Sequence, residues 1–210
     1  MRAFFDLDDV ILNTRDLLRD LERVFEEAGI PLEVFAGCYR KKGASVYSLA
    51  AHTSCMAEQS GVPTERLEKV ARKLLARMHE YVFPDMLALL SEKGREIAIL
   101  SFGGSEFQNA KVLHSGIGRH VAGVYVTEGA KDATLAKICA PEEAFIFVDD
   151  RSHHIETVKA AFPNAIAIFM QRPEGRYNDE VPRTADHRAA HGKDIARIMD
   201  DLRGDPSDPH

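Results

Sequence analysis

The segment FFDLDDVILNT, residues 4–14, places three carboxylates directly behind a short apolar run. The carboxylates are Asp6, Asp8 and Asp9, and the apolar Ala3–Phe5 before them is typical of a buried strand. Carboxylates this close together repel each other and would share protons unless a cation lay between them. We therefore predict that this segment belongs to a functional site at the end of a strand.

Downstream of this segment, short apolar runs alternate with stretches of helical periodicity. The further strands expected are Glu96–Leu100, Val121–Val126, Ala144–Val148 and Ala165–Phe169, with a short edge strand within residues 185–190. The helices expected are Pro84–Lys93, Ser105–His114, Asp132–Cys139, Ser152–Phe162 and Lys193–Leu202, and the spacing of Ser105 and Gln108 suggests a capping box. Strands that alternate with helices predict an α/β fold with a mainly parallel, Rossmann-like sheet flanked by helices.

One interval, from Thr14 to about Phe83, interrupts this alternation. It contains no convincing strand, and its apolar residues recur at helical spacing. We therefore predict three parts: residues 1–14 together with 84–203 form the α/β core, residues 15–83 form a helical insert, and residues 204–210 form a flexible tail.

The composition bears on whether the protein binds nucleic acid, spans a membrane or occupies a reducing compartment. The 210 residues carry a net charge of −6 without a long basic run, which argues against a nucleic-acid surface. No apolar run is long enough to span a membrane. The cysteines, Cys38, Cys55 and Cys139, are odd in number and lack C-x-x-C spacing, which argues against a disulfide framework and a zinc knuckle. We expect a reducing compartment, the cytoplasm.

Polar side chains follow four of the predicted strands. In an open parallel sheet, ligands bind beyond the carboxyl ends of the strands, so these side chains are expected to meet at one edge. They are Asp6 and Asp8 after the first strand, Ser101 after the second, Lys131 after the third and its turn, and Asp149 with Asp150 after the fourth.

These residue types together favour phosphoryl transfer. Oxygen ligands are what Mg²⁺ prefers, and a bound Mg²⁺ would keep Asp6 ionised and attract a phosphate. Asp6 could then attack phosphorus as a carboxylate nucleophile. Asp8 could protonate the leaving oxygen and later deprotonate a water. Ser101 would hydrogen-bond the phosphoryl group, and Lys131 would offset the charge on its oxygens.

The segments FDLDDVILNT, ILSFGG and FVDDRSHHI, together with Lys131, resemble the four motifs of the haloacid dehalogenase-like (HAD) phosphohydrolase superfamily. In this resemblance Asp6, Asp8 and Val10 fit the first motif, D-x-D-x-[TV], and Ser101 fits the second. Lys131 fits the third motif, and the pair Asp149 and Asp150 fits the fourth. The motifs occur in order between residue 2 and about residue 170.

The resemblance implies an aspartyl phosphate on Asp6 and acid–base duty for Asp8. It also implies Mg²⁺ bound by the side chain of Asp6, the backbone carbonyl of Asp8 and the acidic pair. Within that pair we expect Asp150 to be the direct ligand and Asp149 to be water-mediated or orienting. The insert resembles the helical cap that many members carry between the first two motifs. The expected substrate contacts are Ser101, Phe102, Gly103 and Lys131.

Two positions depart from the family pattern. Asp9 occupies a position often held by Gly, and His154 stands where Asn or Asp is frequent. Adjacent histidines on a helix face different directions, so we interpret His153 and His154 as helix-start residues with local hydrogen bonds rather than as a metal pair.

Residues 39–52 of the insert have little apolar periodicity before Tyr47. They are either a specificity loop or a solvated basic turn, and the sequence favours neither. The residues of this stretch that could meet a substrate are Arg40, Lys41, Lys42, Tyr47 and His52.

The function expected first is Mg²⁺-dependent hydrolysis of a small phosphorylated metabolite. A phosphomutase on the same scaffold would pass the phosphoryl group to a second hydroxyl instead of water. A dehalogenase would need no acid at position 8 and no Mg²⁺. A non-catalytic phosphoacceptor or binding protein is the alternative of a different class, but no catalytic position is missing here. The sequence leaves the substrate and the oligomeric state open.

Overall fold

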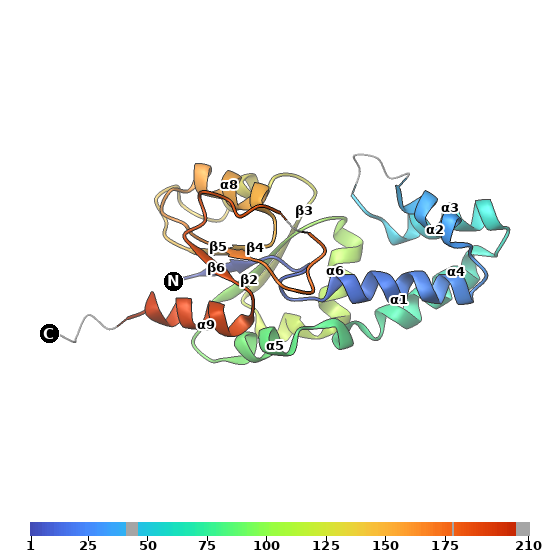
Figure 1. Cartoon of the computed structure of the whole chain (residues 1–210), viewed down its shortest axis with the longest axis horizontal. Coiled ribbons are helices and arrows are strands. Elements are labelled where there is room, and N and C mark those ends of the chain that lie inside the picture. The colour runs from blue at the N-terminus through green and yellow to red at the C-terminus, as the bar shows by residue number, and fades with distance from the viewer. Residues whose placement is uncertain (41–45, 178, 205–210) are drawn as a thin grey trace, which may run out of the picture.

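The computed structural model describes residues 1–40, 46–177 and 179–204, and within them one parallel sheet forms the centre of the core (Figure 1). Its strand order is β3-β2-β1-β4-β5-β6, and each neighbouring pair is parallel. The predicted strands are confirmed, with ends displaced by no more than two residues. The strands are β1 Ala3–Phe5, β2 Ile97–Phe102, β3 Gly123–Thr127, β4 Ile146–Asp149, β5 Ile166–Met170 and β6 His187–Ala189.

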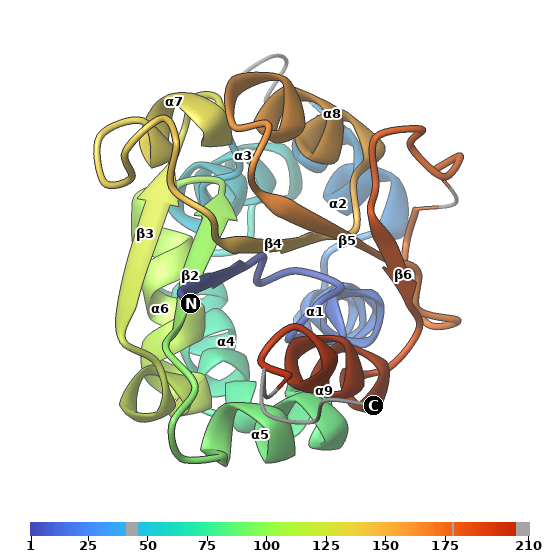
Figure 2. The ribbon, with the colours of Figure 1, turned by 90° about the vertical axis from the view of Figure 1, so that its left-hand side faces the viewer.

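Both faces of the sheet are covered, because successive side chains of a strand point to opposite faces. Phe4 packs in one cluster with residues of α7 and α8, whereas Ala3 and Phe5 pack in another with residues of α1, α5 and α9. Figure 2 shows α7 and α8 on one side of the sheet and α5, α6 and α9 on the other. These helices are α5 Pro84–Ser91, α6 Ser105–Ser115, α7 Lys131–Leu135, α8 Ser152–Ala161 and α9 Gly192–Asp201, with a short 3₁₀ turn, η2, at Ile117–His120.

Between β1 and α5 the described residues form helices and no strand of the sheet, as predicted. They are α1 Thr14–Glu27, α2 Leu32–Arg40, α3 Leu49–Ser60, α4 Thr64–Leu75 and the 3₁₀ turn η1 Met78–Tyr81. We refer to α1–α4 as the helical unit, in which α1 lies beside α4 (Figure 1). The hydrophobic cluster that contains Phe5 continues into this unit through Leu17, Leu21 and Phe25.

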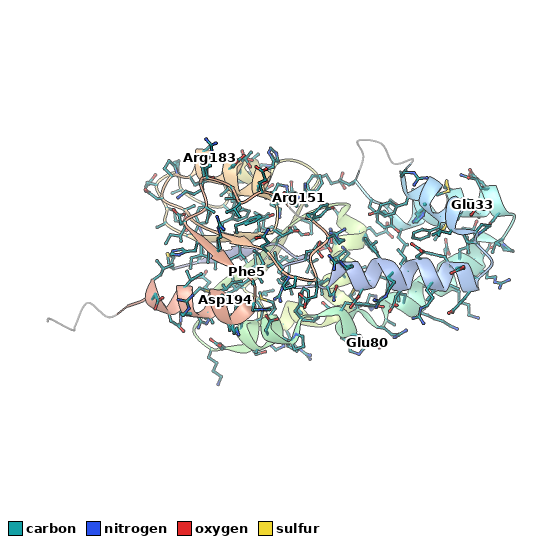
Figure 3. The ribbon with its side chains drawn as sticks, viewed as in Figure 1. Phe5, Glu33, Glu80, Arg151, Arg183 and Asp194 are labelled. Atoms are coloured by element: carbon teal, nitrogen blue, oxygen red, sulfur yellow. A yellow bond between two sulfur atoms is a disulfide. The ribbon has the colours of Figure 1, made fainter. Side chains whose placement is uncertain are left out.

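Figure 3 shows Phe5 inside the core, whereas the exposed Glu33, Glu80 and Arg183 lie on the outside. No helix within residues 1–40, 46–177 and 179–204 is long and apolar enough to cross a membrane. The predicted tail, residues 204–210, lies outside the described residues apart from Gly204.

The prediction about the cysteines is wrong, because Cys38 and Cys55 form a disulfide. Cys38 lies in α2 and Cys55 in α3, and the packing of these two helices brings their Cα atoms to 5.7 Å, within the range that a disulfide requires. Cys139 is buried and free. An odd number of cysteines says only that one is left over, and the pairing of the others depends on how the helices pack.

Candidate active site

An acidic cluster lies at the carboxyl edge of the sheet, where β1 sits between β2 and β4. The backbone N–H of Asp6 donates to the carbonyl of Val148, which holds the end of β1 against the end of β4. Asp6, Asp149 and Asp150 are buried, and one carboxylate oxygen from each lies within 4.8 Å of the others. The strand order reverses at this point of the sheet, which is where open α/β sheets bind ligands.

Lys131 is the cation of this cluster. It begins α7, and its Nζ lies 2.7 Å from Oδ1 of Asp6 and 2.6 Å from Oδ2 of Asp149. Its burial alone would lower the pKa of the ammonium, but the charges of Asp149 and Asp6 outweigh burial and raise it. Lys131 is therefore a fixed positive charge that joins two of the predicted site residues.

The donor set fits a divalent cation such as Mg²⁺. Burial raises the pKa of Asp150, and the charges of Asp6 and Asp149 raise it further, because one lysine cannot balance all the carboxylates. Asp149 is engaged by Lys131, by the backbone N–H of Arg151 and by His154. Within the described part of the chain, the side chain of Asp150 accepts no hydrogen bond. Asp150 is thus the carboxylate best placed to take a metal directly.

Ser101 is the penultimate residue of β2, and it is buried with its hydroxyl Oγ unpartnered among the described residues. A buried polar atom is normally satisfied, so this hydroxyl is available to a ligand. Phe102 and Gly103 follow it at the rim, where Phe102 is exposed. Gly103 has φ +152°, and a Cβ there would lie 2.5 Å from the Gln108 amide nitrogen, so only glycine fits this turn.

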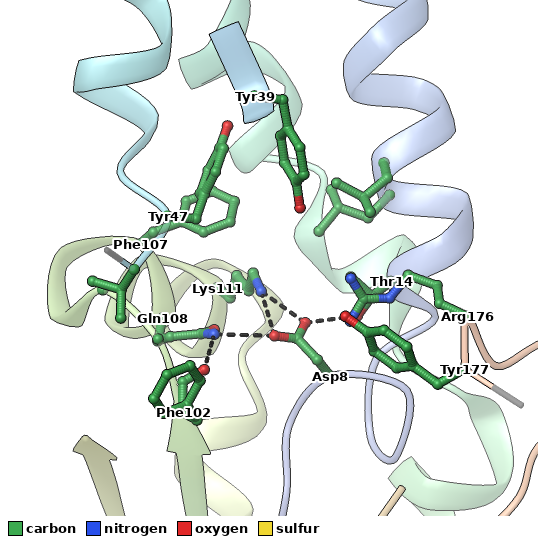
Figure 4. Close-up of a pocket in the computed structure, with 15 residues that line it drawn as sticks. Asp8, Thr14, Tyr39, Tyr47, Phe102, Phe107, Gln108, Lys111, Arg176 and Tyr177 are labelled. Atoms are coloured by element: carbon green, nitrogen blue, oxygen red, sulfur yellow. Dashed lines mark hydrogen bonds and ion pairs between the residues drawn. The ribbon is translucent and has the colours of Figure 1, made fainter. Parts of the chain in front are cut away.

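The side chain of Asp8 is held by three neighbours, Lys111, Thr14 and Gln108 (Figure 4). Lys111 Nζ lies 2.7 and 2.8 Å from its two oxygens, Thr14 donates to Oδ1 at 2.6 Å, and Gln108 donates to Oδ2 at 3.0 Å. Burial acts to raise the pKa of Asp8, but the charges of Lys111 and Arg176 and these hydrogen bonds hold it well below its ordinary value.

The contact with Gln108 shows that the predicted capping box is wrong. Helix α6 has Gly104 as its N-cap and no side-chain cap. The amide of Gln108 instead donates to Asp8 and to the carbonyl of Phe102. The spacing of Ser105 and Gln108 predicted that Gln108 would cap its own helix, but its side chain instead bonds to residues outside that helix.

The two departures from the family pattern have local explanations. Asp9 has φ +57°, the left-handed region that glycine adopts most easily and that Asp tolerates. Its Oδ2 accepts a hydrogen bond from Nε of Arg176 at 2.6 Å. His154 Nδ1 lies 3.1 Å from Oδ1 of Asp149, which confirms the interpretation of His154 as a helix-start residue with a local hydrogen bond. His153 is exposed.

A cavity of about 190 Å³ lies beside Asp8, between the helical unit and the core, and we call it the Asp8 cavity (Figure 4). Phe102 and Gly103 line it, and so does Tyr47. Arg40 and His52 do not: Arg40 ends α2, and His52 is buried with its Nε2 3.0 Å from the carbonyl of Phe35. Lys41 and Lys42 lie outside the described residues. Of the described residues in 39–52, those that line the cavity are Tyr39, Val46 and Tyr47.

Sequence reasoning missed the side chains that surround Asp8. Gln108 and Lys111 lie on the buried face of α6, together with Val112 and Ser115. Two long polar residues on a helix face expected to be apolar were a usable signal. Arg176 and Tyr177 come from the loop after β5, and no local pattern connects that loop with residues 8–9.

Proteins similar to this chain were found among solved structures. No protein-family profile and no curated protein matches the chain. A protein from Burkholderia xenovorans LB400 assigned to the haloacid dehalogenase-like hydrolases matches with a TM-score of 0.76 and 20% identity, over 92% of this chain and 96% of that one. A protein from Bacillus subtilis assigned as a HAD-hydrolase, and solved bound to magnesium, matches with a TM-score of 0.64 and 18% identity, over 95% and 98% of the two chains.

A third match is a protein from Thermotoga maritima assigned as a beta-phosphoglucomutase. Its TM-score is 0.61 at 13% identity, over 96% of this chain and 99% of that one. These matches extend over nearly the whole of each chain, so they include the helical unit as well as the sheet. The chain therefore has the haloacid dehalogenase-like fold.

Proposed function

We propose that this protein is a Mg²⁺-dependent phosphohydrolase that acts on a small phosphate monoester through an aspartyl phosphate on Asp6. The observation that carries the proposal is the convergence of Asp6, Lys131 and the acidic pair in one buried cluster at the switch point of the sheet. The hydroxyl of Ser101, unpartnered among the described residues, lies on the neighbouring strand, and Asp8 lines a cavity.

The metal would be held by Asp6, Asp149 and Asp150, with the backbone carbonyl of Asp8 as the further ligand that the family resemblance implies. When bound, Mg²⁺ supplies positive charge that balances the carboxylates and the phosphate. The magnesium in the Bacillus subtilis structure supports this choice of metal.

The side chains of the chain supply the remaining steps. Lys131 orients Asp6 through Oδ1, and a carboxylate oxygen of Asp6 attacks phosphorus while the bond to the ester oxygen breaks. The phosphate monoester enters as the monoanion, and its proton passes through Asp8 to the ester oxygen, which leaves as an alcohol; Asp8 is therefore ionised before and after this step. The ionised Asp8 then removes a proton from water, whose oxygen attacks the aspartyl phosphate and regenerates Asp6. Lys111 and Thr14 favour the ionised Asp8 that this second step uses.

Two related reactions fit the fold less specifically. A phosphomutase would use the same cluster and deliver the phosphoryl group to a second hydroxyl, and the Thermotoga maritima match keeps this candidate open. A dehalogenase would need neither Asp8 as an acid nor Asp150 as a metal ligand. The engagement of Asp8 by Lys111, Thr14 and Gln108 at the border of a cavity therefore favours phosphoryl transfer.

The proposal is tested with acetyl phosphate and p-nitrophenyl phosphate as substrates. Phosphate release should require Mg²⁺, stop when a chelator is added and return when Mg²⁺ is restored. Undiminished hydrolysis in chelator would contradict the metal assignment. Halide release from a 2-haloacid, with no phosphate release from acetyl phosphate or p-nitrophenyl phosphate, would favour the dehalogenase instead.

A further inference from the structure

The Asp8 cavity lies beside Asp8 and is separate from the acidic cluster. Asp8 lines the cavity, but Asp6, Lys131 and the acidic pair do not. If Asp8 protonates the leaving oxygen, as the proposed function requires, the group attached to that oxygen extends past Asp8. The cavity is therefore the binding site of the leaving alcohol, and the residues that line it indicate which kind of alcohol binds there.

Aromatic rings form much of the wall. Tyr39 of α2 lies 5.4 Å from Tyr47, and Tyr47 lies 4.9 Å from Phe107 of α6, measured between ring centres. Figure 4 shows these three rings on the side of the cavity opposite Asp8. Leu17 and Leu18 of α1 add aliphatic surface. Rings at these distances pack well against a further planar ring, in offset or edge-to-face contact.

The charges that line the cavity are already balanced. Its cations are Lys111 and Arg176, and each has a carboxylate partner, Asp8 for Lys111 and Asp9 for Arg176. Among the described residues that line the cavity, no cation is left without a carboxylate partner to compensate a second phosphate or a carboxylate on the leaving group. Because an uncompensated buried charge is costly, the cavity favours an uncharged alcohol.

The volume of the cavity limits the size of the ligand. An apolar cavity of about 150 Å³ holds one benzene molecule, whereas sites for larger ligands usually have about 300–1,000 Å³. At about 190 Å³ the Asp8 cavity accommodates one ring and a short linker. We infer that the substrate is the phosphate monoester of an alcohol that carries a single planar, uncharged ring.

The inference, which rests on the proposed function, is tested by comparing kcat/KM for two alkyl phosphates in the presence of Mg²⁺. Benzyl phosphate carries one planar ring, and glycerol 1-phosphate carries none. Benzyl phosphate should be preferred by at least about tenfold, the scale on which an apolar pocket discriminates. Fructose 1,6-bisphosphate, whose second phosphate has no partner in the cavity, should be the poorest substrate.

Variants of residues that line the cavity distinguish binding of the leaving group from the phosphoryl-transfer step. Phe107→Leu and Tyr39→Leu each remove one ring, the first from the core and the second from the helical unit. Each should reduce the preference for benzyl phosphate over glycerol 1-phosphate by about three- to tenfold, mainly through KM for benzyl phosphate. Leu113→Ala is the matched control, because Leu113 is exposed on the same helix as Phe107 and does not line the cavity.

Acetyl phosphate has no ring and reports the phosphoryl-transfer step by itself. If it is hydrolysed with Mg²⁺ but benzyl phosphate and glycerol 1-phosphate have equal kcat/KM, the inference about the substrate is wrong and the proposed function stands. If both ring variants keep the full preference, the cavity does not bind the leaving group. If acetyl phosphate is not hydrolysed, the proposed function fails and this inference fails with it.

Discussion

Asp6 and Asp8 lie two residues apart, yet the fold gives their carboxylates different surroundings. Asp6 contacts Lys131 and belongs to the acidic cluster. Burial raises the pKa of Asp6, and the neighbouring carboxylates add to this effect. Asp8 is surrounded by Lys111, Thr14 and Gln108 at the wall of the cavity. Leu7, which is completely buried, separates the two residues in the chain.

Asparagine at each position should therefore give different kinetic defects. Asp6→Asn removes the attacking oxygen anion and a metal ligand, so no phosphoenzyme should form with any substrate. Asp8→Asn keeps Asp6, so phosphoryl transfer from p-nitrophenyl phosphate should survive in part, because its leaving group needs little protonation. Transfer from an alkyl phosphate should fall by roughly 10²–10⁴.

The aspartyl phosphate should accumulate in Asp8→Asn, since the water that hydrolyses it has lost its base. Hydride reduction followed by mass spectrometry would locate the modified residue. A label on Asp8, or equal loss for good and poor leaving groups without accumulation, would overturn the assignment of roles.

At the level of elements, the end of α2 and the residues just before α3 form one side of the Asp8 cavity. Tyr39 lies near the end of α2, and Tyr47 lies just before α3. The disulfide between Cys38 and Cys55 ties these two helices together and closes the segment that contains both tyrosines. The cross-link therefore restrains the chain where the cavity needs a fixed wall.

Reduction of this disulfide should destabilise the protein. A cross-link that closes a loop of about 15 residues contributes about 3 kcal/mol by restricting the unfolded chain, and the two cysteines here are 17 residues apart. Urea titrations with and without a reductant should show a loss of about 2–4 kcal/mol in the free energy of unfolding. The Cys38→Ala, Cys55→Ala double variant should not respond to the reductant. Coincident transitions for the wild type under both conditions would show that the cross-link contributes nothing.

On the scale of the whole molecule, the two segments that join the helical unit to the core run beside each other. The backbone N–H of Asn13 donates to the carbonyl of Tyr81, and that of Phe83 donates to the carbonyl of Ile11. These paired segments coincide with the predicted boundaries at residues 14 and 83. We therefore predict that these segments act as the hinge of a helical unit that closes over the site.

A phosphate analogue should change the behaviour of this hinge. Hydrogen exchange measured with Mg²⁺ and vanadate should show altered protection at Asn13 and Phe83, together with slower exchange near Tyr47. Amides within β4 and β5 serve as the internal control and should stay unchanged. Uniform protection across both boundaries, unaffected by the analogue, would contradict a closing cap.

The sequence by itself determined the parallel sheet and its order of elements, because buried strands and amphipathic helices leave periodic patterns in a single stretch of chain. It also determined which residues follow the strand ends, and parallel strands bring such residues to one edge whatever the details of packing. Asp6, Lys131 and Asp149 were predictable on this basis, and the structure places them in contact.

Only the tertiary structure decided what surrounds Asp8 and which cysteines pair. Lys111 lies 103 residues from Asp8, and Arg176 lies 167 residues from Asp9. Contacts over such separations depend on the packing of α6 and of the loop after β5, and no periodicity encodes them. The disulfide likewise follows from the packing of α2 against α3. Periodic patterns record which side of an element is buried, whereas the identity of the partner is decided when the elements pack together.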